Sequence, residues 1–200
     1  MENSLPQITY LFGAGASAQV LPTIKGLPER IKIVQNFIEK EYLYEDDEKF
    51  ISQQVPSFYK KDAKEYLLQG LDKLYDFSHN HSTIDTYAKK LYLNGKSYEV
   101  EELAFFLALY FNIEQKIVGT DPRYDTFLIS ILQSNVYTFP NNLKFLTWNY
   151  DLQMEIAHHM LVGRGTDDID FRLFNTEKLD IKKDSFTSVK LNGSCNLKNR

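Results

Sequence analysis

The sequence predicts an α/β protein: a parallel sheet flanked by helices, with a large helical insertion between its first and second strands. Three observations predict this class. A strand-like run at residues 8–12 leads into a glycine turn, and helical periodicity follows over about residues 29–140. Short strand-like runs separated by a helix then return from residue 143 onwards. Because strands that alternate with helices favour a parallel sheet, we expect one sheet assembled from both ends of the chain.

The first strand runs into the sequence Gly-Ala-Gly-Ala-Ser-Ala at residues 13–18. This Gly-x-Gly-x-x-Ala pattern is typical of a strand that turns into a helix in a dinucleotide-binding, Rossmann-like fold. We expect Gly13 to adopt a backbone conformation that other residues cannot adopt. Gly15 should leave room for a diphosphate, and Ala18 should let the helix pack closely on the strand. The first N–H groups of that helix are expected to face an anion. A tight turn without a ligand fits the same residues.

The middle of the chain has the apolar spacing of helices. Two prolines and a glycine at residues 21–28 shorten the first helix and predict a loop beside the glycine turn. Apolar residues three and four positions apart then predict further helices, and the segment at 98–118 is apolar on most sides, so we expect it to be central. The predicted helices cover residues 29–44, 60–77, 82–93, 98–118 and 124–137.

Strand patterns return near the C-terminal end of the sequence. Residues 143–148 read as a buried strand followed by a helix at 151–157, with further strands at 171–174 and 187–191. Ligands of open parallel sheets bind outside the carboxyl ends of the strands. Three loops should therefore converge there, at residues 13–17, 147–151 and 192–194.

The second of these loops holds an amide and a carboxylate, Asn149 and Asp151. The two side chains could simply cap the following helix. They could instead hold ribose hydroxyls and a carboxamide, while an apolar wall excludes water. The sequence leaves both interpretations open.

Composition narrows the class of protein. The formal net charge of −4 argues against a broad nucleic-acid interface. Cys195 is the only cysteine, which excludes an internal disulfide and a multi-cysteine zinc module, and we expect it to be a small buried residue. His158 and His159 are adjacent and cannot form an i, i+4 ligand pair, so we expect no metal. The N-terminus is acidic and no apolar run approaches 18 residues, which predicts a cytoplasmic protein without membrane contact.

Three motifs, each following a strand, together resemble one known family. They are Gly-Ala-Gly-x-Ser from residue 13, Thr-x-Asn-x-Asp from residue 147 and Leu-x-Gly-Ser from residue 191. In this order the set resembles the sirtuin-like (silent information regulator) NAD-binding family. The Asn-Tyr-Asp of the second motif is typical of its bacterial branch of NAD-consuming antiphage-defence proteins.

The resemblance implies a single NAD-binding domain over residues 1–200, with a sheet that usually continues beyond this point, so the chain fits the N-terminal part of a longer protein. It implies that Asn149 faces the nicotinamide ribose and that Asp151 holds the carboxamide. NAD is the implied substrate, with no metal. The implied cofactor-binding residues are Gly13, Ala14, Gly15, Ser17, Thr147, Asn149, Asp151 and, from the helical insertion, Asp85.

The family cleaves the bond between nicotinamide and ribose, and its defence branch mostly passes the ADP-ribose to water. The resemblance therefore implies an NAD+ hydrolase (NAD glycohydrolase) that depletes NAD in antiphage defence. It further implies that the chain forms a homo-oligomer or binds a partner protein of the defence system.

One position departs from the family pattern. Asn192 stands where the family has a histidine before the glycine of the third motif, and an amide cannot accept a proton near neutral pH. Deacylation of lysine needs that base, so we expect none. Hydrolysis depends on it less, because nicotinamide leaves as a neutral group and oriented oxygens with Asp151 can stabilise the sugar cation. The catalytic candidates are Asn149, Asp151, Asn192 and His81, the last as a substitute base that could equally be a surface histidine.

Two other functions remain open. A dehydrogenase of the ordinary dinucleotide-binding type would share the first motif, but it needs an acidic residue at the end of a second strand. Glu39 and Glu41 have the right distance, yet they follow a predicted helix. The second alternative is a catalytically weak or inactive module that binds NAD or ADP-ribose and acts through partners, which Asn192 favours.

Overall fold

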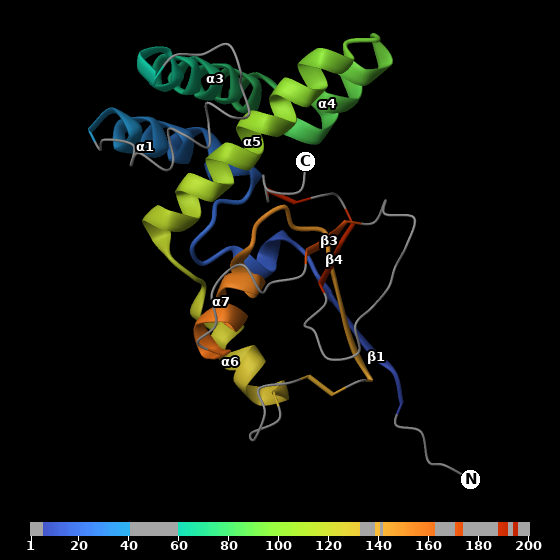
Figure 1. Cartoon of the computed structure of the whole chain (residues 1–200). Coiled ribbons are helices and arrows are strands. Elements are labelled where there is room, and N and C mark those ends of the chain that lie inside the picture. The colour runs from blue at the N-terminus through green and yellow to red at the C-terminus, as the bar shows by residue number, and fades with distance from the viewer. Residues whose placement is uncertain are drawn as a thin grey trace. The chain divides into compact units, whose positions relative to one another are not determined.

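The structure is a computed structural model that describes residues 6–40, 60–132, 139–140, 142–162, 171–173, 188–191 and 194–195. Contacts between residues divide the chain into two compact units. The first, which we call the sheet unit, comprises residues 1–21 and 115–200, and the second, the helical unit, comprises residues 22–114. Figure 1 shows their elements along the chain.

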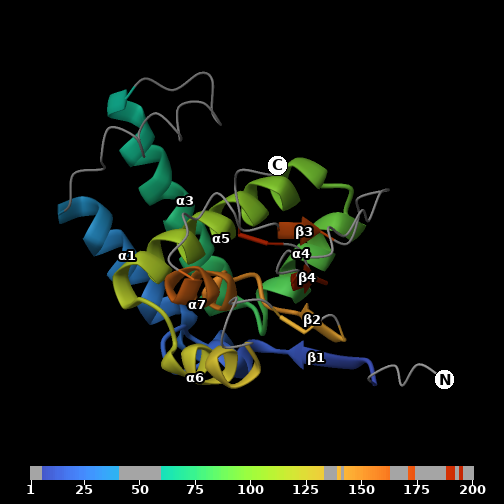
Figure 2. The same ribbon diagram turned by 60° about the horizontal axis from the view of Figure 1, so that its bottom comes forward.

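The sheet unit contains a small parallel sheet. Its strands are β1 (Ile8–Phe12), β2 (Leu143–Thr147), β3 (Phe171–Leu173) and β4 (Ser188–Lys190), in the order β1-β2-β4-β3. Each neighbouring pair is parallel, and the register places Phe12 beside Thr147 and Thr147 beside Lys190. The carboxyl ends of three strands therefore lie level (Figure 2). A mainly helical α/β protein with a parallel sheet is confirmed.

Two helices cover the sheet and form its core. Helix α6 (Pro122–Ile131) and helix α7 (Gln153–Val162) pack against each other (Figure 1). Aromatic rings of β1 and β2 fill the space beneath α6: the Tyr10 ring stacks on Phe145 at 5.9 Å and meets Phe127 edge-on at 5.0 Å. The buried residues of this core are Tyr124, Leu128, Phe145, Met154 and Ala157.

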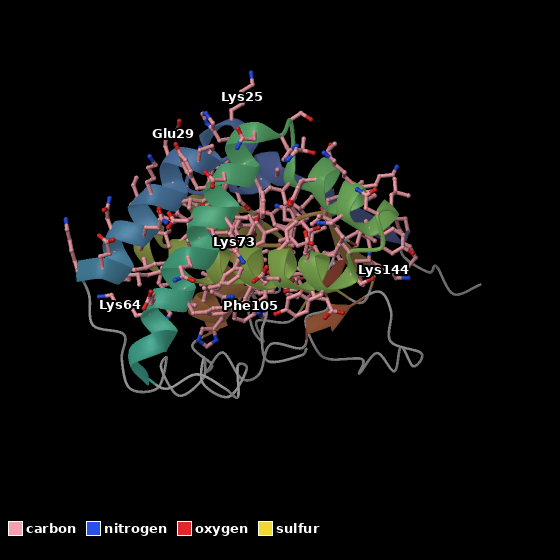
Figure 3. The ribbon with its side chains drawn as sticks, turned by 90° about the horizontal axis from the view of Figure 1, so that it is seen from above. Lys25, Glu29, Lys64, Lys73, Phe105 and Lys144 are labelled. Carbon is pink, nitrogen blue, oxygen red and sulfur yellow. The ribbon has the colours of Figure 1, made fainter. Side chains whose placement is uncertain are left out.

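The helical unit contains α1 (Leu27–Lys40), α3 (Lys60–Asn80), α4 (Ile84–Leu93) and most of α5 (Ser97–Val118), with the short 3-10 helix η2 (Ile24–Gly26) before α1. Its core is a stripe of branched residues on each of two helices: Ile31, Val34 and Ile38 on α1, and Leu67, Leu71 and Leu74 on α3. A Cβ atom at Gly70 would lie 1.9 Å from the Phe106 ring, so only glycine lets α5 pack this closely on α3. Lys73 of α3, labelled in Figure 3, also pairs with Glu102 of α5 at 3.0 Å.

The predicted elements agree with this structure, except at their ends. The helices predicted at 60–77, 82–93 and 98–118 correspond to α3, α4 and α5. Predicted helical residues 41–44 and 133–137 lie outside the described residues. The compact helical unit covers residues 22–114, whereas the helical insertion was predicted over about 29–140. The unit ends earlier than the predicted insertion because α6, although it precedes β2 in sequence, packs on the sheet.

Within the described ranges, no helix combines the length and the apolar character needed to cross a membrane.

Candidate functional site

The glycine turn follows β1 directly and is built differently from the expected dinucleotide motif. Residues Ala14–Ser17 form a four-residue 3-10 helix, η1, rather than the start of an α-helix, so a helix dipole contributes little to anion binding there. Gly13 has φ −120° and ψ −179°, an extended conformation open to any residue, so the expected special conformation is wrong. Ala18 is exposed, and Ala16 instead packs against the core of the sheet unit.

The turn is nevertheless open to a ligand. Gly13, Ala14 and Gly15 are all exposed. Among the described residues, a Cβ atom built on either glycine would meet no atom within 4 Å. Neither backbone conformation nor packing among the described residues therefore requires these glycines, and no side chain of those residues fills the space above them.

Ser17 closes the turn and joins it to the second loop. The side chain is buried, with 2% of the residue exposed. Its hydroxyl lies 3.0 Å from the Tyr124 hydroxyl and donates to Asp151 Oδ2 at 3.0 Å. The Asn149 side-chain amide donates to the Ser17 hydroxyl oxygen at 3.4 Å. Residues 134 positions apart in sequence thus meet in one hydrogen-bonded cluster at the carboxyl edge of the sheet.

The second loop is ordered by its own side chains. Thr147 Oγ1 accepts a hydrogen bond from the Asn149 backbone N–H at 3.0 Å. Asp151 Oδ1 accepts from the Gln153 N–H at 3.1 Å, so one carboxylate oxygen caps α7. The capping interpretation is confirmed for this oxygen, while the other faces Ser17. The Asn149 side-chain amide donates to Ser17, and Thr147, Asn149 and Asp151 are all buried.

A buried lysine lies behind the cluster. Lys190, the last residue of β4, donates to the Asp151 carbonyl oxygen and forms an ion pair with Glu155 at 3.1 Å. Burial raises the pKa of the Asp151 carboxyl, and the attraction of Lys190 opposes this only in part. Sequence analysis missed Lys190 and Glu155. A lysine near the end of a predicted strand was the only available signal.

An arginine next to the turn was also missed. Arg123 lies in the first turn of α6 and its Nη2 donates to the Ala16 carbonyl oxygen at 3.3 Å. The guanidinium is held by Asp121, the N-cap residue of α6, which accepts from Arg123 Nη2 at 2.7 Å and from Nε at 3.0 Å. This bonding lowers the pKa of the Asp121 carboxyl. A cation therefore lies beside the glycine turn, although none is near it in sequence.

The two ends of the third loop contact the second. The Leu191 N–H donates to the Thr147 carbonyl at 2.8 Å, and the Cys195 N–H donates to the Tyr150 carbonyl at 2.9 Å. Asn192 itself lies outside the described residues, so its predicted place in the site stays a prediction. Cys195 is a buried small residue as expected, and burial raises the pKa of its thiol to about 12.

The remaining candidates belong to the helical unit. His81 follows α3 and stacks on Tyr87 at 4.6 Å, and Asp85 is exposed in the first turn of α4. Their predicted approach to the NAD site stays a prediction. In the part of the chain that the structure describes, no group of three His, Cys, Asp or Glu residues is placed to hold a metal ion.

Comparisons of the chain with family models, with curated proteins and with solved structures found no match.

Proposed function

We propose that this chain binds NAD+ at the carboxyl edge of a Rossmann-like sheet and hydrolyses the bond between nicotinamide and ribose. The single observation that carries the proposal is the meeting of Ser17, Asn149 and Asp151 in one buried cluster next to an exposed, glycine-rich turn. Ligands of open parallel sheets bind where such turns follow the strands.

The glycine turn is the proposed diphosphate site. Its exposed residues, Gly13, Ala14 and Gly15, present backbone without bulky side chains. A diphosphate can therefore approach the main chain closely. The proposal relies on this access and not on a helix dipole, because η1 has only four residues.

The polar cluster is the proposed site of bond cleavage. The bond between C1′ of the ribose and the ring nitrogen breaks, its electron pair neutralises the pyridinium, and nicotinamide leaves without needing a proton. Water then adds to C1′ and releases one proton, which gives ADP-ribose. The Asn149 amide and the negative charge of Asp151 stabilise the sugar cation that develops in between. Both Asp151 oxygens already accept hydrogen bonds, from Ser17 and Gln153, so in this proposal the carboxylate acts mainly through its charge.

A second candidate is a module that binds NAD+ or ADP-ribose without turning it over and acts through a partner protein. Asn192 favours this alternative because an amide cannot serve as a base. The helix cap formed by Asp151 also favours this alternative, because one oxygen of its carboxylate is occupied by the Gln153 N–H and is not free to contact a substrate.

The biological role proposed for either candidate follows the family resemblance. A hydrolase would deplete cellular NAD+ during antiphage defence. Self-association, or contact with a defence-system partner, would switch it on.

The decisive experiment incubates the purified chain with NAD+ and measures nicotinamide and ADP-ribose by chromatography, with binding followed by calorimetry. We expect equal amounts of both products, and at least a hundredfold slower release in an Asn149→Ala variant. Asn36→Ala, at an exposed position of α1, is the matched control and should keep full activity. Binding without products would favour the module, and the absence of binding would refute both candidates.

A further inference from the structure

We propose that the Arg123 guanidinium binds the diphosphate of the nucleotide, and that Asp121 is the positioning residue that aims it. This inference rests on the proposed function, since it assigns one contact of the same substrate. It starts from the place of Arg123: the side chain leaves the first turn of α6 and reaches the glycine turn, where Nη2 donates to the Ala16 carbonyl oxygen at 3.3 Å.

The hydrogen-bond donors of Arg123 are only partly used. Nε donates to Asp121 Oδ1, and Nη2 donates to Asp121 Oδ2 and to the Ala16 carbonyl. Across the described ranges, Nη1 has no hydrogen-bond acceptor. The side chain is 45% exposed. Both N–H groups of Nη1 in the planar guanidinium fork are therefore available beside the exposed turn, where each can donate to a phosphate oxygen.

Asp121 fixes the direction of this fork. Its side chain is fully buried, and its Oδ2 also accepts the Gln19 N–H at 3.2 Å. Its backbone N–H donates to Gln153 Oε1 at 2.7 Å, which ties the residue to α7. The turn holds the Asp121 carboxylate and α7 holds its backbone, so the guanidinium bonded to this carboxylate has little freedom. The guanidinium is thus preorganised, and binding needs little further ordering of the side chain.

The carboxylate also limits what kind of contact Arg123 can make. Asp121 offsets most of the positive charge, so attraction over long distances is weak. The contribution comes from short, directed hydrogen bonds. A lysine at this position would keep the charge, but it cannot bond Asp121 through two nitrogens and still present a free pair of donors to a phosphate.

The test measures the dissociation constants of NAD+ and of inorganic pyrophosphate by calorimetry for the wild-type chain and its variants. We expect Arg123→Gln to weaken NAD+ binding by about tenfold to a hundredfold, and Arg123→Lys to weaken it by about tenfold. Lys144→Gln removes an exposed cation from β2 of the same unit and should leave affinity unchanged. If the Arg123→Gln chain does not fold, the Arg123→Lys variant decides the matter, because it keeps a cation beside Asp121.

The positioning role of Asp121 has its own readout. Asp121→Asn should weaken NAD+ binding in the wild-type chain and have no further effect in the Arg123→Gln background, whereas a purely structural role would lower affinity in both. Equal affinities of wild type and Arg123→Gln would overturn the inference and leave the proposed function standing. A wild-type chain that binds no NAD+ would refute the proposed function, and this inference with it.

Discussion

Replacing Ser17 by alanine tests whether the glycine turn and the second loop meet as described. The Ser17 hydroxyl contacts Tyr124, Asn149 and Asp151 in the described cluster. Alanine removes this oxygen without adding bulk, so the backbone of the turn stays as it is. Any change in stability then reports the buried contacts that are lost.

The magnitude follows from the groups left behind. The Tyr124 hydroxyl and Asp151 Oδ2 lose a partner at 3.0 Å each, and both residues are buried. A buried polar group that loses its partner costs about 1–3 kcal/mol, whereas the 3.4 Å contact of Asn149 adds little. Because Asp151 keeps its bond from Gln153, we expect Ser17→Ala to lower the free energy of unfolding by about 2–4 kcal/mol.

Urea denaturation monitored by tryptophan emission is the appropriate assay. Trp148 is the only tryptophan and directly follows β2, so its emission reports the sheet unit. Ser130→Ala is the matched control: Ser130 is exposed, its hydroxyl bonds only the Phe127 carbonyl within α6, and its loss should cost less than about 0.5 kcal/mol.

A double-mutant cycle isolates the central bond. Ser17→Ala combined with Tyr124→Phe should show a coupling energy of about 1 kcal/mol, the usual net value of one hydrogen bond. A Ser17→Ala variant as stable as Ser130→Ala, or a coupling of zero, would refute the convergence of the turn with the loop.

Three further predictions address binding, packing and pH. Gly15→Val should abolish NAD+ binding in calorimetry while leaving the midpoint of thermal unfolding unchanged, since a Cβ there meets no atom of the residues that the structure describes; unchanged affinity would argue against a ligand on the turn. Gly70→Ala should destabilise the helical unit by about 1–3 kcal/mol in helix-monitored urea unfolding, because its Cβ would overlap the Phe106 ring, and a neutral effect would contradict this packing. The Asp151 carboxyl is ionised only above its raised pKa, so the rate of nicotinamide release should rise with pH in a range above 3.8, the ordinary value for aspartate. Asp151→Asn should remove this rise in rate. A rise that persists in the variant would assign it to another group.

Local sequence patterns were enough to predict the strands. Residues 8–12 are rich in β-branched and aromatic side chains and residues 143–147 are mainly apolar, and a parallel pairing is expected once helices separate the two strands. The same reasoning placed the carboxyl ends of the strands together. It correctly predicted that Ser17, Asn149 and Asp151 lie close to one another.

Two features of the turn could not be predicted from its motif. The pattern Gly-x-Gly-x-x-Ala implies an α-helix, but the prolines and glycine at residues 22–28 leave room only for the 3-10 turn η1. Without an α-helix to pack, Ala18 stays exposed and Gly13 needs no special conformation.

Residues that reach the site through tertiary packing were missed. Arg123 is brought to the turn because the aromatic core beneath α6 holds that helix on β1, and no local signal encodes such a contact between residues 107 positions apart. Lys190 is buried at the end of a strand because Glu155 lies opposite it on α7. Both depend on partners that only the folded chain identifies.

A crystal structure of the chain with NAD+ tests the proposed site most directly. We predict the diphosphate on the turn at residues 13–15, within hydrogen-bond distance of Arg123, and the nicotinamide ribose beside Asn149. Nucleotide bound only in the helical unit, or no nucleotide at saturating concentration, would contradict the placement of an NAD+ site at the carboxyl edge of the sheet.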